Sequence, residues 1–497
     1  MEHISSDSQL YFVDNTSNDD PAVHRIRDEI VKLAPFQKNW NKPIPATWMS
    51  LDMDLRMLKQ QKRYIIQFSE VMDIDKRNEV SIGDSEEIKF CLRYMHLTGS
   101  ILFFENETDS VDTQEPLIVT HPQWIVDAFR CIIKAMRFID THEDDSTHLH
   151  IRQFLKSGIL TVGLLERLME KYQDNQDVLI QIMQRLHLLV VVTEKTDEHK
   201  WIVPALLPPG DAPLFVISRR HAVTSKTLCF VFKSKLLPAI YDKLLALCLS
   251  SVLRIEKDGK GNAIMKRGSA CFIVNRACDL LLSCTGAVVS CTLINKNGDR
   301  DFKWKCSFVR SLLCDFIKEI STQFHHGNLV YELCLHCKHE ICSDSCPIPI
   351  SDIRTETRVR CCETSSDDLH WLDKSEAEPW MEKRNRELGN DYKLLVEILD
   401  SQPTERMMAL LSRRHIGSQY KLFFSFLGLK PATISSHTTP NTELPTIIFH
   451  LFVIWRNKKD KEATVREILN AMKFVELDFM DAAAELDKEF MRSSNST

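Results

Sequence analysis

The sequence predicts a multidomain α+β protein that ends in an all-α bundle of six short helices. Its 497 residues are more than one domain of about 100–200 residues needs, which predicts three to four domains. Hydrophobic residues make up 44% and charged residues 27%, as in ordinary globular proteins. The spacing of apolar residues also changes along the chain, from mixed to strand-like to helical.

Charge and glycine content exclude several classes of function. The net charge of −6 provides no positive field for nucleic acid or an anionic membrane. No apolar run reaches the about 20 residues of a membrane span, and 14 glycines leave little room for phosphate-binding loops. The 16 cysteines mostly stand singly in apolar segments, as in a reduced compartment. We therefore expect a cytoplasmic protein with no nucleic-acid partner and no membrane span.

Residues 1–39 predict one strand and one helix. Residues 9–15 (QLYFVDN) form the strand, and residues 18–21 (NDDP) are typical of a helix start. Val23, Ile26 and later apolar residues then recur at helical spacing. A lone strand and helix cannot bury both of their faces, so this segment has the form of the end of a larger α/β domain.

Residues 40–211 predict a winged-helix-like module. Helical spacing runs from Trp48 to about Tyr94, and two strands follow at 100–104 and 116–120. The pattern then predicts, in order, a helix over 122–133, a helical pair that begins at 154–160, and strands at 188–193 and 201–206. Helices followed by a hairpin are the reason for this fold prediction.

The rest of the chain predicts three further segments. Residues 212–330 form an α+β domain with a hairpin at Asn297-Gly298-Asp299. Residues 331–389 are Cys-rich, then acidic, without sustained periodicity, which predicts a linker. Residues 390–490 hold short amphipathic helices, which predict the compact antiparallel bundle.

Several motifs resemble the Roco family of proteins. The motifs are Tyr11-Phe12-Val13-Asp14-Asn15, Ile44-Pro45-x-x-Trp48, Leu97-x-Gly99-x-Ile101-Leu102-x-Phe104, Ile118-x-x-x-Pro122-Gln123-Trp124, Phe154-x-x-x-Gly158 and Trp201-Ile202-Val203-Pro204. The first is similar to the end of a Roc GTPase domain, and the others resemble the COR domain that follows Roc. The resemblance covers residues 9–330, and implies COR halves at 40–211 and 212–330.

The C-terminal segment resembles a death domain. Its signature residues are Leu427-Gly428-Leu429, Ile434, Leu451-x-x-x-Trp455, Ala463-Thr464-Val465 and Ile468-Leu469. Tyr420 stands where the family usually places a tryptophan in the second helix. The resemblance implies a six-helix bundle of death-fold type. A COR region followed by a death domain is similar to Roco proteins of the death-associated-protein-kinase type.

The family's catalytic motifs are absent from the sequence. No GxxxxGK[ST] loop, which would hold the phosphates of GTP, and no kinase HRD or DFG element occurs. We therefore expect no catalytic or cofactor-binding residues. The resemblance implies a scaffold that dimerises through COR, recruits other death-fold proteins and acts in cell-death or stress signalling. The alternative is the truncated regulatory half of a Roco GTPase or kinase whose catalytic domains lie upstream.

Four cysteines are the candidate metal ligands. Cys334, Cys337, Cys342 and Cys346 are spaced closely enough for four thiolates to close a tetrahedral zinc site. The alternative interpretation is a set of free thiols in a linker. Apart from this structural zinc, the sequence predicts no cofactor.

The candidate interaction surface lies in the bundle, where charges of opposite sign are segregated. The basic set is Arg406, Arg413, Arg414 and Lys421, and the acidic set is Glu476, Asp478, Asp481 and Glu485. Complementary fields of this kind steer and orient docking between copies or related domains. The alternative is a solvated charged surface without a partner.

Overall fold

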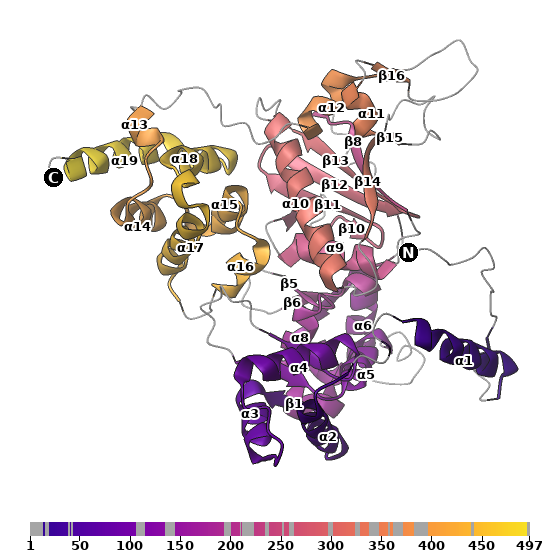
Figure 1. Cartoon of the computed structure of the whole chain (residues 1–497). Helices are drawn as coiled ribbons and strands as arrows, with labels where there is room; N and C mark the ends of the chain where they lie inside the picture. The colour runs from indigo at the N-terminus through magenta and orange to yellow at the C-terminus, as the bar shows by residue number, and fades with distance from the viewer. Residues whose placement is uncertain are drawn as a thin grey trace, which may run out of the picture. The chain divides into compact units, whose positions relative to one another are not determined.

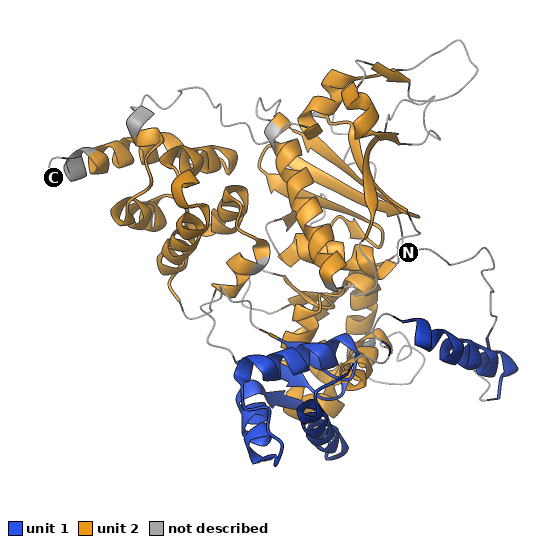
Figure 2. Ribbon diagram, in the orientation of Figure 1, with its two compact units in different colours: residues 1–104, 115–121 blue, residues 105–114, 122–497 orange. Residues whose placement is uncertain are grey.

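A computed structural model gives the fold, and it combines helices and sheets throughout, which confirms a multidomain α+β architecture. Residues 1–104 and 115–121 form one compact unit, and residues 105–114 and 122–497 form a second (Figure 2). The structure describes residues 13–14, 19–37, 40, 43–105, 115–134, 145–192, 200–208, 210, 223–233, 238–250, 253–257, 263–296, 302–323, 329–336, 347–355, 358–360, 371–381, 396–438 and 442–494.

The first unit packs helices against a small antiparallel sheet. Its elements are α1 (Pro21–Leu33), α2 (Ala46–Gln60), β1 (Ile65–Gln67), α3 (Phe68–Arg77), α4 (Ser85–Leu97), β2 (Leu102–Phe104) and β3 (Leu117–Val119) (Figure 1). The strand order is β1-β3-β2. Leu51 and Leu55 of α2 share one core with Ile88 of α4 and Ile118 of β3, as the helical spacing predicts.

Helix α1 begins where the sequence predicts. The Asp20 carboxylate accepts a hydrogen bond from the Ala22 amide at 2.8 Å, and Pro21 is the first helical residue. Ile30 and Leu33, which the periodicity assigns to one apolar face, are exposed. Of the strand predicted at 9–15, only residues 13–14 lie in the described part of the chain, and they are not in a strand.

The second unit begins with helices around another three-stranded antiparallel sheet. The elements are α5 (Pro122–Ile133), α6 (Asp145–Ser157), β4 (Ile159–Thr161), α7 (Val162–Leu168), α8 (Gln176–Arg185), β5 (Val190–Val192) and β6 (Lys200–Ile202). The strand order is β4-β6-β5. The predicted α5, β5 and β6 are confirmed.

Two strands of these small sheets were predicted as helix, and those predictions were wrong. They are β1 and β4, each three residues long and directly followed by a helix. So short a segment shows no alternation of period two, and its neighbours impose a helical pattern on the sequence. Pairing with β3 and β6, strands distant in sequence, stabilises them as strands.

A larger antiparallel sheet follows, covered by helices α9 (Pro238–Ser250) and α10 (Phe302–Gln323) (Figure 1). Its strand order is β10-β11-β12-β13-β8-β14-β15, with β7 paired to β13 and β9 paired to β11. The bounds are β7 (Val223–Thr224), β8 (Thr227–Phe232), β9 (Arg254–Ile255), β10 (Met265–Lys266), β11 (Ser269–Asn275), β12 (Cys278–Thr285), β13 (Val288–Asn295), β14 (Tyr331–His336) and β15 (Ile348–Pro349).

The sheet continues past residue 330, where the sequence predicted a linker. β14 pairs with β8 along its whole length, and the segment also contains α11 (Ile350–Thr355), β16 (Arg358–Arg360), β17 (Trp371–Asp373) and α12 (Lys374–Met381). Fully buried Trp380 of α12 donates a hydrogen bond to the Lys226 carbonyl at 2.9 Å. The described residues between 331 and 381 therefore belong to the α+β domain, and the boundary predicted at residue 330 was wrong because these elements are short.

The hairpin predicted at Asn297-Gly298-Asp299 lies outside the described residues. The described tight connections of the sheet lie between β11 and β12 and between β12 and β13, where Gly286 has a φ of 63°. The next described element after β13 is α10.

The chain ends in a helical bundle. After the short α13 (Val396–Leu399), the described residues form α14 (Glu405–Arg414), α15 (Tyr420–Leu427), α16 (Pro431–Ser436), α17 (Leu444–Lys459), α18 (Val465–Phe474) and α19 (Phe479–Ser494). The side chains of Thr404 and Thr464 cap α14 and α18 by accepting from backbone amides. The predicted helical periodicity after Pro403 is confirmed.

Gly158 gives a test of the packing in the second unit. Its φ is +70°, and an added Cβ would lie 2.7 Å from Leu207 Cδ2. We expect Gly158→Ala to lower the local free energy of unfolding by about 1–3 kcal/mol, because both the backbone and the contact are incompatible with a side chain. Hydrogen exchange of the β6 amides measures this change.

Gly163 in α7 is the matched control, because no atom lies within 4 Å of the Cβ it would gain. Gly163→Ala should leave the stability unchanged or raise it by up to about 1 kcal/mol. Equal destabilisation by both substitutions would contradict the proposed contact at Gly158.

Candidate interaction site on the C-terminal helical bundle

Helix α15 is the centre of the bundle. Seven of its eight residues are buried, although a helix at a surface buries only one face. Phe424 contacts Phe452 of α17 with ring centroids 5.0 Å apart, and Phe423 lies 5.6 Å from the same ring. The helix ends at Gly428, whose φ of 94° terminates it in the left-handed conformation. Other elements therefore cover α15 on every side.

The basic candidates lie on or near α14, in three different environments. Arg406 and Arg413 are exposed and share one face, because they stand seven residues apart on α14. Arg414 is exposed but paired inside the bundle, with its Nη1 2.8 Å from Glu485 Oε1 of α19. Lys421 on α15 is partly buried, and burial lowers the pKa of its amine.

The acidic candidates lie just before α19 and in its first two turns. The Asp478 carboxylate accepts a hydrogen bond from the Asp481 amide at 3.1 Å, so it caps the helix. Glu476 has a φ of 61°, and its carboxylate lies 3.8 Å from the Lys305 amine of α10. Asp478 and Asp481 are the exposed members of the acidic set that bind no cation in the described ion pairs.

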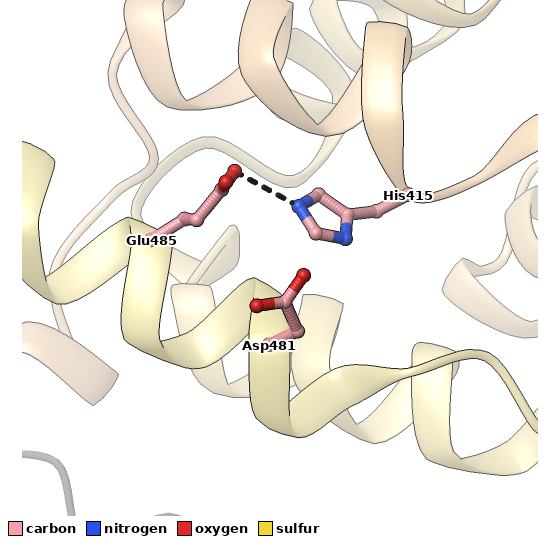
Figure 3. A group of neighbouring side chains, drawn as sticks. All are labelled: His415, Asp481 and Glu485. Atoms are coloured by element: carbon pink, nitrogen blue, oxygen red, sulfur yellow. Dashed lines mark hydrogen bonds and ion pairs between the residues drawn. The ribbon is translucent and has the colours of Figure 1, made fainter.

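His415 joins this group, and the sequence analysis missed it. It lies at the C-cap of α14 with a side chain 6% exposed, and its Nε2 is 3.0 Å from Glu485 Oε2 (Figure 3). Asp481, one turn before Glu485, brings its carboxylate to the same place, so that the three ligand atoms lie within 4.8 Å of one another. Such a trio can bind a divalent cation, but a partly buried hydrogen bond already ties His415 to Glu485.

The same hydrogen bond changes the acidity of Glu485. The bond to His415 is the main cause that lowers the pKa of this carboxyl group, partial desolvation opposes it, and Arg414 adds to the lowering. Because His415 and Arg414 end α14 while Glu485 lies in α19, this charged cluster ties the first long helix of the bundle to the last.

The candidate zinc ligands are only partly described. Cys334 lies buried in β14 opposite Cys229 of β8, and burial raises the pKa of its thiol to about 12. Zinc binds the thiolate, so this position disfavours Cys334 as a ligand. Cys337, Cys342 and Cys346 lie outside the described residues.

Comparison with known families bears on the first half of the chain. Residues 45–207 match the family model described as C-terminal of Roc, COR-A domain. The match supports membership of the Roco family, in which this region follows the Roc domain. No curated protein matches the chain. In the described part of the chain, every helix is too short or too polar to span a membrane.

The pH dependence of stability tests the charged cluster. A carboxyl group whose pKa is lower in the folded protein stabilises the fold above its unfolded pKa, near 4.5, and this stabilisation is lost as the pH falls through the folded value. We expect Glu485→Gln to cost about 1 kcal/mol at pH 7 and progressively less as the pH falls below 4.5. Calorimetry of the full chain between these pH values measures the difference.

Asp487→Asn is the matched control, because Asp487 lies two residues further along α19 and faces away from His415. It removes the same charge and should leave the melting temperature almost unchanged. A Glu485→Gln effect that persists at acid pH would show that the lost carboxylate does not act through these charged partners.

Proposed function

We propose that the protein is a non-enzymatic scaffold of intracellular signalling. In this proposal the COR region dimerises, and the C-terminal bundle acts as a death domain that binds other death-fold proteins. The proposed setting is the cytoplasm, in cell-death or stress signalling. The absence from the sequence of a phosphate-binding loop and of kinase motifs supports a role without catalysis.

The observation that carries the proposal is the pair of exposed, oppositely charged surfaces on the bundle. Arg406 and Arg413 present the basic surface on α14, and Asp478 and Asp481 present the acidic surface at the start of α19. Two bundles can therefore meet head to tail, with the basic surface of one against the acidic surface of the next.

Dimerisation would strengthen weak contacts between bundles. A COR-linked dimer holds two bundles on one particle, so that after the first contact the second becomes intramolecular. The effective concentration of the second bundle then depends on the connection between the domains rather than on the solution. Moderate affinity of each bundle is sufficient for stable assembly.

A second candidate function is that of a regulatory half of a Roco GTPase or kinase. The observation that favours it is α1, where Ile30, Val31 and Leu33 are 57–65% exposed on a short helix. Apolar residues exposed together on one element are typical of a surface that packs on another domain. The COR-A match is compatible with either function.

The mass of the endogenous protein distinguishes the two functions. An antibody against residues 403–490 on a denaturing blot of native tissue should detect a band near 57.5 kDa if the scaffold acts alone. A single, much larger band would favour the regulatory half of a nucleotide switch.

Charge reversal on the bundle tests the head-to-tail contact. We expect the full chain to associate beyond the dimer at low salt, and Arg413→Glu or Asp481→Lys to weaken that association by about tenfold, because like charges then face each other. Sedimentation velocity over a concentration series measures the change.

Two controls make this experiment specific. A mixture of the Arg413→Glu and Asp481→Lys chains should associate again, because each restores the charge pair that the other lacks. Lys461→Glu reverses an exposed charge elsewhere in the bundle and should have little effect. If the mixture remains dissociated, or if high salt does not weaken the wild-type association, the head-to-tail contact is wrong.

A further inference from the structure

A stretch near the beginning of α10, from Lys305 to Val309, is buried on every side. Residues 305–309 are all buried, whereas further along the helix Ser311 and Asp315 are exposed. A helix that packs only on a sheet buries one stripe and leaves the opposite side in water. An additional element therefore covers the first turns of α10, and the contacts below identify it as the C-terminal bundle.

Three phenylalanines form the apolar part of this contact. Phe308 of α10 lies 4.9 Å from Phe474 of α18 and 6.0 Å from Phe426 of α15, measured between ring centroids. Phe426 and Phe474 stack on each other at 4.5 Å. Each ring is at most 7% exposed, so the three rings form a closed aromatic cluster that unites the two domains.

Polar contacts surround the aromatic cluster. The Lys305 side chain is 2% exposed, and its amine lies 3.8 Å from the Glu476 carboxylate. Asn275 of the sheet donates a hydrogen bond from Nδ2 to the Phe474 carbonyl at 3.4 Å. A buried ammonium needs compensating charge, and Glu476 of the bundle is one of the groups that provide it.

We propose that α10 occupies a protein-binding surface of the bundle and thereby keeps the chain in a closed, autoinhibited state. The covered surface is formed by Phe426, Phe474 and Glu476. Because α10 occupies this surface, we expect the partner to resemble α10. It should be a helix in which an aromatic residue follows a lysine by three positions, as Phe308 follows Lys305. The closed state rests on the contacts above, and its signalling role rests on the function proposed for the bundle.

Release of α10 leaves other packing contacts of the bundle in place. The buried residues of the sheet, α9, α10 and the bundle form one continuous apolar cluster, and within it Phe423 and Phe424 pack on Phe452 inside the bundle. A partner helix that places its own lysine against Glu476 and its own aromatic ring between Phe426 and Phe474 competes with α10 directly. Binding of the partner and opening of the chain are therefore coupled.

Charge reversal at Lys305 tests the closed state. In the full chain, Lys305→Glu places a carboxylate against Glu476 and should open the contact. Hydrogen exchange of residues 305–309 and of the α15 and α18 amides should become at least about tenfold faster. Exchange in β12, in the middle of the sheet, should remain unchanged, which shows that the domain is still folded.

A charge swap excludes a simple loss of folding. Glu476→Lys, at a side chain 30% exposed, should open the contact from the bundle side. The double variant Lys305→Glu with Glu476→Lys should restore slow exchange, because the pair is re-formed with reversed charges. Lys303→Glu is the matched control: it lies on the same helix but pairs with Glu378 of α12, and it should not accelerate exchange in α15.

The outcomes separate the closed state from its signalling role. Unchanged exchange in both single variants, or a double variant as fast as either, overturns the closed state. Faster exchange that the double variant reverses supports it. Sedimentation of the same proteins then tests the signalling role. Open variants that associate more strongly than wild type support this role. Open variants that associate no more than wild type contradict the function proposed for the bundle but leave the closed state standing.

Discussion

The arrangement of the second unit depends on one constraint, which is that α15 is buried along almost its whole surface. In its sequence, YKLFFSFL, seven of the eight residues are buried, and only Lys421 is partly exposed. The bundle covers one side through Phe452 of α17, and α10 with Phe474 of α18 covers another. Without the α+β domain, the bundle would leave Phe426 in contact with water and expose an aromatic surface. Complete burial of α15 therefore requires both the bundle and the α+β domain.

Local patterns were sufficient for most of the fold. Helices with a clear apolar stripe, such as α2, α5 and α18, were predicted because the periodicity lies within the element. Strands β1 and β4 were missed because three residues carry no period, and their stability comes from partners far away in the chain. The same reason explains the misplaced boundary at residue 330. β14 is a strand because it pairs with β8, about 100 residues earlier.

For the candidate site, the sequence predicted which residues are charged but not which charges face each other. Arg414 and Glu485 were assigned to two separate surfaces, yet they form an ion pair across 71 residues of sequence. His415 was not considered, because no spacing rule connects a residue at the end of α14 with an acidic pair in α19. The contact of Phe308 with Phe474 is equally non-local. Each is a tertiary contact between two elements, and the apolar periodicity of each element can be explained without that contact.

The bundle thus has two surfaces with different physical roles. The charged surface, with Arg413 and Asp481, is exposed in the closed chain and acts over several ångströms, so it can orient an approaching bundle before any contact forms. The aromatic surface around Phe426 acts only on contact and is covered by α10. When the charged surface steers an approaching bundle but the aromatic surface is covered, encounters form fast and are short-lived. This is because burial of apolar surface, rather than long-range charge, sets the rate of dissociation. Under the function proposed for the bundle, such a chain remains near its partners while closed and forms lasting complexes only after α10 has been displaced.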